Sequence, residues 1–191
     1  MRRIWLIVTT LALAVLVTAC AGMGTGAASP TPTPTVDTKP RLAPPDLLLE
    51  AASGQQLDKL GSYQWVLPSG FAANVQAHGY DFPTPPLTLK SGETVRFVAR
   101  NGSQPATLAL AAYPQQGNVK QVVTQSAGVI NAFILPPSAL AQATLSGSPQ
   151  TWTVNLKPGA YILLLKGTWP SPVKARTAPL TGEYVYSVKV Q

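Results

Sequence analysis

Cysteine and histidine supply much of the nucleophilic, acid–base and metal chemistry of proteins, and each occurs once among the 191 residues, as Cys20 and His78. A single cysteine excludes a disulfide within the chain. His78 precedes Asp81 by three residues, and such a pair could support a proton transfer or a weak metal contact. Ordinary zinc sites take three or four protein ligands. We therefore expect His78 to lie at the surface or at the edge of a turn.

Other catalytic patterns are missing from the sequence. It contains no Gly-x-Ser-x-Gly and no glycine-rich phosphate loop that follows a strand and opens a helix. A serine nucleophile would have His78 as its only histidine base. A glycosidase needs two facing carboxylates, but the acidic residues of the chain are few and dispersed. These features predict that the protein is not an enzyme and uses no cofactor.

The aromatic residues are better candidates for a binding site. Trp169 lies in the long, proline-rich and basic loop Gly167–Thr181, together with Lys174 and Arg176. An exposed aromatic ring beside cations could contact a sugar, a polymer or a partner protein. The alternative is that Trp169 tucks under its own loop. Tyr113, at the end of a predicted strand, is a weaker binding candidate.

The amino-terminal segment 1–20 begins with two arginines, after which residues 4–19 carry no charge. A membrane-spanning helix needs about 20 apolar residues, so this length favours a signal peptide. The segment ends in Leu-Val-Thr-Ala-Cys, which resembles the lipobox of bacterial lipoproteins. The resemblance implies cleavage between Ala19 and Cys20 and a diacylglycerol on the Cys20 sulfur. The alternative is an uncleaved anchor helix with an incidental cysteine.

Three regions follow from composition: a signal peptide at 1–19, the lipidated cysteine with a spacer at 20–45, and a domain at 46–191. The spacer contains the run Ser-Pro-Thr-Pro-Thr-Pro-Thr, which favours extended polyproline II at about 3.1 Å per residue. The expected location is extracytoplasmic, on the cell membrane. Ala21, and not an aspartate, follows Cys20. If the organism has two membranes, this absence of Asp resembles the pattern that permits sorting to the outer membrane.

The charge pattern narrows the choice of partners. The formal net charge is +7, but only 11% of residues are charged, and the Lys and Arg residues are scattered. A nucleic-acid-binding protein would show a clustered basic face, so we exclude that class. The expected partners are the membrane, through the lipid anchor, and an envelope protein or polysaccharide.

The domain is predicted to be all-β, an antiparallel Greek-key sandwich, because short strands alternate with turns. Asp46–Leu60 is expected to form a short helix, and the residues after Pro136-Pro137 a helical turn. Trp65 and Trp152 lie in predicted strands and are expected to fill the core. The predicted strands are Ser62–Leu67, Ala72–His78, Leu87–Lys90, Glu93–Arg100, Ala106–Ala112, Val119–Gln125, Gln150–Leu156, Ala160–Lys166 and Glu183–Val190.

Three stretches, LTLKSGETVRFVARNGSQPATLAL, WTVNLKPGAYILLLKG and GEYVYSVKV, resemble the cupredoxin family in their order of strands and turns. An immunoglobulin-like module remains the alternative. Blue-copper sites need two His, one Cys and usually a Met. Gln104-Pro105-Ala106 stands where the first histidine would lie, and the domain contains no Cys or Met. The resemblance therefore implies a cupredoxin-like fold that lacks the copper ligands.

Three functions remain open. The first is a membrane-anchored, non-catalytic β-sandwich that binds or scaffolds something outside the cell. The second is a metal- or redox-related accessory protein of cupredoxin ancestry, and the third is an extracellular hydrolase. If the domain is cupredoxin-like, the loop Asn101–Pro105 and the loop Gly167–Thr181 should meet at one end of the sandwich, where they would form the binding face.

Overall fold

The computed structural model describes residues 42–77, 79–124, 128–174 and 178–191, and in these ranges every regular element is a strand. The strands, in chain order, are β1 (Leu47–Ala51), β2 (Gly54–Leu57), β3 (Lys59–Val66), β4 (Ala72–Val75), β5 (Leu87–Leu89), β6 (Thr94–Ala99), β7 (Thr107–Pro114), β8 (Val119–Thr124), β9 (Gly128–Phe133), β10 (Ala141–Leu145), β11 (Gln150–Thr153), β12 (Gly159–Trp169) and β13 (Leu180–Val190). The prediction of an all-β domain is confirmed for the described part of the chain.

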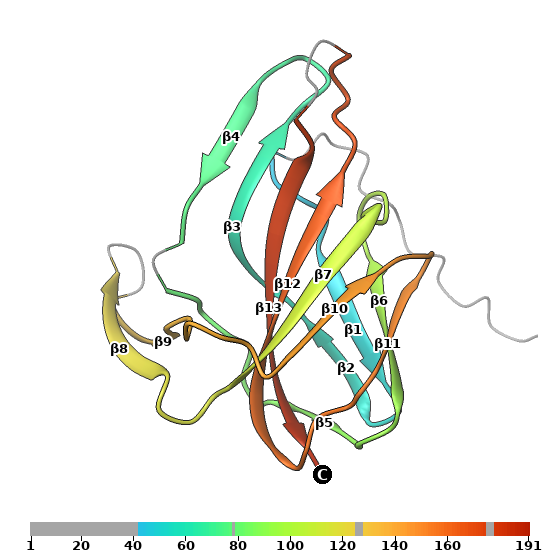
Figure 1. Ribbon diagram of the computed structural model, residues 1–191. Helices are drawn as coiled ribbons and strands as arrows, with labels where there is room; N and C mark the ends of the chain where they lie inside the picture. Colours follow the sequence, from blue (N-terminus) through green and yellow to red (C-terminus); the bar gives the residue numbers. More distant parts are fainter. Residues whose placement is uncertain (1–41, 78, 125–127, 175–177) are drawn as a thin grey trace, which may run out of the picture. The chain divides into compact units, whose positions relative to one another are not determined.

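The strands form two main sheets (Figure 1). The smaller has the order β11-β6-β1-β2, and the larger has the order β10-β7-β12-β13-β3-β4. Both are antiparallel along these paths, while β5 joins the larger sheet as a parallel neighbour of β13. β8 and β9 form a separate two-stranded hairpin, which extends to one side of the large sheet in Figure 1.

Apolar side chains from both main sheets form one core between them, in a sandwich-like arrangement. The strand predicted at Glu93–Arg100 contains β6, in which Val95 and Phe97 are fully buried while Thr94 and Arg96 are exposed. Trp152 of β11 is also buried, as expected. This alternation occurs because successive side chains of a strand point to opposite faces of the sheet.

The helix predicted for Asp46–Leu60 is wrong, because this segment contains β1, β2 and the start of β3. Leu47 and Leu49 are buried at a spacing of two, whereas Leu48 between them is only partly buried. β1 pairs with β6 on one side and with β2 on the other, so both β1 and β2 belong to the small sheet. A helix this short is marginal in water without packing, so burial of two leucines on a sheet decides the conformation.

The helical turn predicted after Pro136-Pro137 is also wrong at its end, since Ala141–Leu145 is β10. Its five residues pair in register with β7, from Ala141 opposite Ala112 to Leu145 opposite Leu108. Local propensity alone would allow this segment to form a helical turn. Pairing with β7 instead gives its backbone groups hydrogen-bond partners in the sheet. β10 thus becomes the edge strand of the large sheet.

A second, smaller apolar cluster lies on the large sheet, apart from the main core. Tyr113, Ile162 and Val185 pack there against Phe133 of the hairpin strand β9. The Tyr80 amide donates to the Phe133 carbonyl oxygen at 2.9 Å, and the Phe133 amide donates to the Tyr80 carbonyl oxygen at 2.8 Å. The hairpin is therefore attached to the sheet through this cluster, and Tyr113 belongs to its packing.

Candidate functional site

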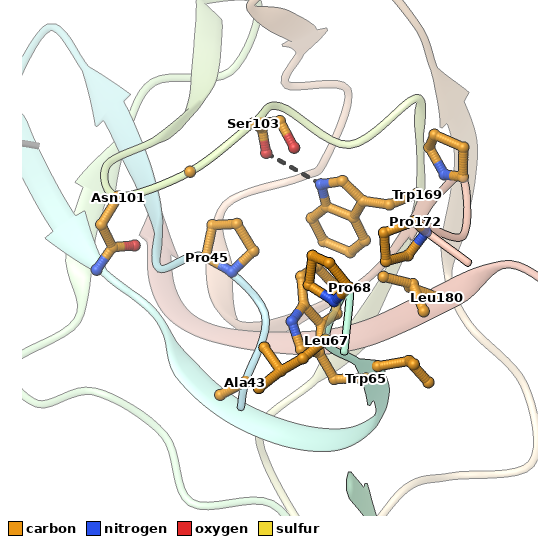
Figure 2. Close-up of a pocket in the computed structure, with 13 residues that line it drawn as sticks. Ala43, Pro45, Trp65, Leu67, Pro68, Asn101, Ser103, Trp169, Pro172 and Leu180 are labelled. Atoms are coloured by element: carbon orange, nitrogen blue, oxygen red, sulfur yellow. Dashed lines mark hydrogen bonds between the residues drawn. The ribbon is translucent and has the colours of Figure 1, made fainter. Parts of the chain in front are cut away.

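A pocket of about 390 Å³ opens at the end of the sandwich where β3, β6 and β12 finish and β1 and β13 begin (Figure 2). We call it the end pocket. Its wall consists of tryptophan, proline, small aliphatic and uncharged polar residues, and it contains no ionisable side chain. The lining residues are Ala43, Pro45, Trp65, Val66, Leu67, Pro68, Asn101, Gly102, Ser103, Trp169, Pro170, Pro172 and Leu180.

Trp169 joins the two loops whose meeting the cupredoxin resemblance implies. It is the last residue of β12, and its indole N–H donates to the Ser103 carbonyl oxygen at 3.0 Å. The Trp169 ring meets the Trp65 ring edge to face, with centroids 5.2 Å apart and planes at 83°. The loop after β6 and the segment between β12 and β13 therefore do meet, at the end pocket (Figure 2).

The segment before β1 forms a third wall of the end pocket and is held by hydrogen bonds. The Tyr184 hydroxyl donates to the Pro45 carbonyl oxygen at 2.8 Å. Asn101 accepts from the Asp46 amide with Oδ1 and donates to the Asp46 carboxylate with Nδ2, both at 2.8 Å. Gly102 lies so close that a Cβ there would be 2.6 Å from Cγ of Pro45. These contacts hold the pocket wall in place.

Asn101→Ala should therefore lower the free energy of unfolding by about 1–3 kcal/mol, because the amide and the carboxylate of partly buried Asp46 each lose a hydrogen bond to Asn101. Chemical denaturation of the soluble mature chain measures this change. The matched substitution is Asn131→Ala, at an exposed position of β9, for which we expect a change within about 0.5 kcal/mol. Equal effects of the two substitutions would contradict the role assigned to Asn101.

The candidate site residues from the sequence fall in different places. Trp169 is only 3% exposed, so the structure agrees with the tucked ring, one of the two possibilities that the sequence left open for this residue. Its ring nevertheless lines the end pocket. Lys174 is exposed but does not line the pocket. Tyr113 is 9% exposed and packs in the second cluster. Arg176 lies outside the described residues.

Three other site residues predicted from sequence are ones that the structure does not describe. Cys20, Ala19 and His78 lie outside the described ranges. Asp81, proposed to work with His78, is described, and its carboxylate lies 3.1 Å from Nζ of Lys59. Both side chains are about half exposed, so this ion pair contributes little to stability.

Trp65 is the pocket residue that sequence reasoning assigned to another role. It was expected in the core, but it is only partly buried and packs at the core edge while it lines the end pocket. The signal that could have found it is Trp-Val-Leu-Pro, in which an aromatic residue near a strand end comes shortly before a proline. Trp169, the last residue of β12, is likewise followed by a proline, Pro170.

A second hollow, of about 400 Å³, lies on the outer side of the large sheet. Lys166 and Glu183, which are opposite each other in β12 and β13, line it. The Tyr80 hydroxyl donates to Glu183 at 3.0 Å. Burial raises the pKa of Tyr80 to about 12, and the Glu183 carboxylate adds to the effect. Tyr80 therefore stays protonated at neutral pH and serves as a hydrogen-bond donor rather than as a base.

Within the described ranges, no group of three or more His, Cys, Asp or Glu side chains gathers as metal ligands would. Gln104, at the position where the resemblance places a copper-binding histidine, donates its amide to the Phe97 carbonyl oxygen at 3.3 Å. That side chain takes part in the packing of the loop after β6. The described part of the chain also contains no helix with the length and apolar character to cross a membrane.

Comparison with known proteins adds no relative. No model of a protein family matches the chain, and no curated protein or solved structure does so either. The end pocket must therefore be interpreted from its own geometry and chemistry.

Proposed function

We propose that this protein is a bacterial lipoprotein, anchored outside the cell through Cys20, whose β-sandwich is a binding domain without catalytic activity. The observation that carries the binding role is the end pocket, built by four separate segments, two of which carry Trp65 and Trp169. Ligand sites of proteins are concave, largely apolar and lined by a few polar groups. The end pocket has this character, and contacts within the protein hold its walls.

The chemistry of the pocket wall supports binding in preference to catalysis. Acid–base catalysis needs a group whose pKa lies near the working pH, and the lining residues have no ionisable side chain. The polar groups of the lining side chains are the Asn101 amide, the Ser103 hydroxyl and the indole N–H groups of Trp65 and Trp169, to which backbone groups are added. Such groups can orient a ligand by hydrogen bonds.

We further propose that the sandwich is a Greek key of the cupredoxin-like kind in which the end pocket takes the place of the copper site. The support is the meeting of the loop after β6 with the segment that follows Trp169. The partner of the domain is then an envelope component reached from the membrane surface. An immunoglobulin-like sandwich is the alternative fold.

Cys20→Ala should abolish lipid attachment, because the acyl group is carried by the cysteine sulfur. Cells that produce the variant are grown with a labelled fatty acid, and the label in the protein is measured after electrophoresis. We expect no label and a chain that keeps residues 1–19, while Ala21→Ser, the matched neighbour, stays labelled and cleaved. Label on Cys20→Ala would refute the anchor.

The binding role is tested with a photo-crosslinking residue at Ser103, at the rim of the end pocket, in the full-length protein in intact cells. Gln116 is the matched control, since it is exposed in the turn after β7, at the opposite end of that strand. We expect a discrete adduct from Ser103 and none from Gln116. If Ser103 gives no adduct, or both positions give the same adducts, the end pocket is not a binding site.

A further inference from the structure

The end pocket has a specific hydrogen-bonding character besides its apolar lining. Trp169 uses its indole N–H within the fold, on the Ser103 carbonyl oxygen. Trp65, in contrast, is only partly buried, and no hydrogen bond to its indole N–H exists within the described part of the chain. The pocket therefore offers two aromatic rings, no charge and an indole donor. It matches a ligand that has apolar rings, no charge and strong acceptors.

Proline-rich segments in the polyproline II conformation have these properties. Their pyrrolidine rings are apolar, their backbone is not hydrogen-bonded internally, and their carbonyl oxygens point outward as acceptors. Such segments dock in aromatic-lined grooves of several protein classes and lose little conformational entropy when they bind. The rim prolines Pro45, Pro68, Pro170 and Pro172 stiffen the walls of the end pocket. A rigid site of this kind suits a rigid, extended ligand.

The chain itself contains a segment with this chemistry. Residues 29–36 read Ser-Pro-Thr-Pro-Thr-Pro-Thr-Val, with three prolines and no charged side chain. They lie in the spacer, 21 residues of which (residues 21–41) separate Cys20 from the first described residue, Leu42. The uncharged character of residues 29–36 matches the uncharged lining of the end pocket. Every copy of the protein presents both the ligand and the site.

We propose that the end pocket binds residues 29–36 of a second copy of this chain, in the extended polyproline II form. The inference rests on the proposed function, since lipid anchoring brings copies together on one membrane. Each copy would give its spacer to one neighbour and receive the spacer of another. Such a heterologous contact builds rings or open chains of molecules. Anchoring in one plane strengthens a contact that is weak for a free peptide.

The first test measures the site with a synthetic peptide of residues 29–36. The receiving protein is the mature chain, residues 20–191, with Cys20→Ser and with Pro30, Pro32 and Pro34 changed to alanine so that no copy supplies the ligand. This chain contains three tryptophans, whose indole N–H signals are followed by NMR. We expect saturable shifts for Trp65 and Trp169 and none for Trp152, which lies in β11.

Two controls distinguish specific recognition of the peptide from non-specific binding. Trp65→Phe keeps an aromatic ring and loses the indole donor, and we expect it to weaken binding about tenfold, the value of a hydrogen bond of about 1.4 kcal/mol. A peptide with alanine at its three proline positions should not bind. If the proline peptide does not bind, or if the two peptides bind equally, the proposal is overturned.

The second test identifies the occupant as a second copy. Sedimentation of the mature Cys20→Ser chain should show an average mass that rises with concentration, and the peptide should reverse the rise. The triple alanine variant of the spacer should stay monomeric. An unchanged mass over the whole concentration range would overturn the proposal. So would an adduct from Ser103 that contains only another protein, although that result would leave the binding role intact.

Discussion

Trp169→Ala should lower the free energy of unfolding by about 3–5 kcal/mol, the usual cost of removing a large buried aromatic side chain. The ring is 3% exposed and packs against two aromatic neighbours, Trp65 at 5.2 Å and Tyr184 at 6.3 Å between centroids. Its environment is tight, since a Cβ at Gly167 would lie 2.6 Å from Cη2 of this ring. Alanine would leave a cavity, and the Ser103 carbonyl oxygen would lose its donor.

Urea denaturation of the soluble mature chain measures the effect of Trp169→Ala, and Phe71→Ala serves as the control. Phe71 follows β3 but is 63% exposed, so we expect a change of less than about 0.5 kcal/mol from its removal. Trp169→Ala should also abolish binding of the proline-rich peptide. A loss of stability below about 1 kcal/mol at Trp169 would show that the two loops do not depend on this ring.

The second large effect is expected for Tyr186→Ala, again about 3–5 kcal/mol. Tyr186 lies in β13 of the large sheet and is fully buried. Its ring packs on Phe97 of the small sheet, with centroids 6.0 Å apart, and its hydroxyl donates to the Leu47 carbonyl oxygen at 2.7 Å. This side chain therefore links the two sheets. Tyr186→Phe keeps the ring and should cost only about 1 kcal/mol, the net value of one hydrogen bond.

Tyr186 also gives a pH signature that distinguishes its hydroxyl from its ring. Burial raises the pKa of Tyr186 well above its ordinary value, and the charges of Asp58 and Tyr184 add to the effect. An unfolded tyrosine loses its proton near pH 10. Above this pH the folded state holds a proton that the unfolded state has released, so the free energy of unfolding falls as pH rises.

Unfolding of the wild-type chain and of Tyr186→Phe at pH 8 and pH 11 checks this sign. We expect the stability difference between the two chains to shrink or reverse at the higher pH, since phenylalanine has no proton to lose. Tyr63→Phe is a suitable control because Tyr63 is only partly buried. A constant difference between wild type and Tyr186→Phe would show that the hydroxyl does not couple folding to pH.

Patterns of alternation and turns were sufficient to predict much of the domain. Each stretch predicted as a strand overlaps an observed strand, because a strand with one buried face has a period of two that is visible in sequence. β1 was not predicted from periodicity. Leu47, Leu48 and Leu49 form a continuous apolar run, for which helix and strand cannot be separated by periodicity. Pairing of β1 with β6, nearly 50 residues away, decided its conformation.

The site was less accessible to prediction than the strands. The sequence singled out Trp169 and the prolines of the loop Gly167–Thr181 as unusual and left open whether the Trp169 ring is exposed or tucked under its loop. Trp169 is buried because Ser103, 66 residues earlier in the chain, accepts its hydrogen bond, and because Trp65 packs on it. Contacts of this kind depend on which strand ends meet, and the meeting of strand ends cannot be predicted from the local sequence.

The sequence by itself determined the all-β class, the scarcity of catalytic groups, and the lipobox-like segment that predicts an anchor at Cys20. These features depend on local composition, spacing and periodicity, which a single chain displays directly. Only the tertiary structure decided that four segments distant in sequence enclose one uncharged pocket, to which they contribute Trp65 and Trp169. The reason is physical: a pocket is formed by the packing of strand ends, and that packing is set by long-range pairing in two sheets.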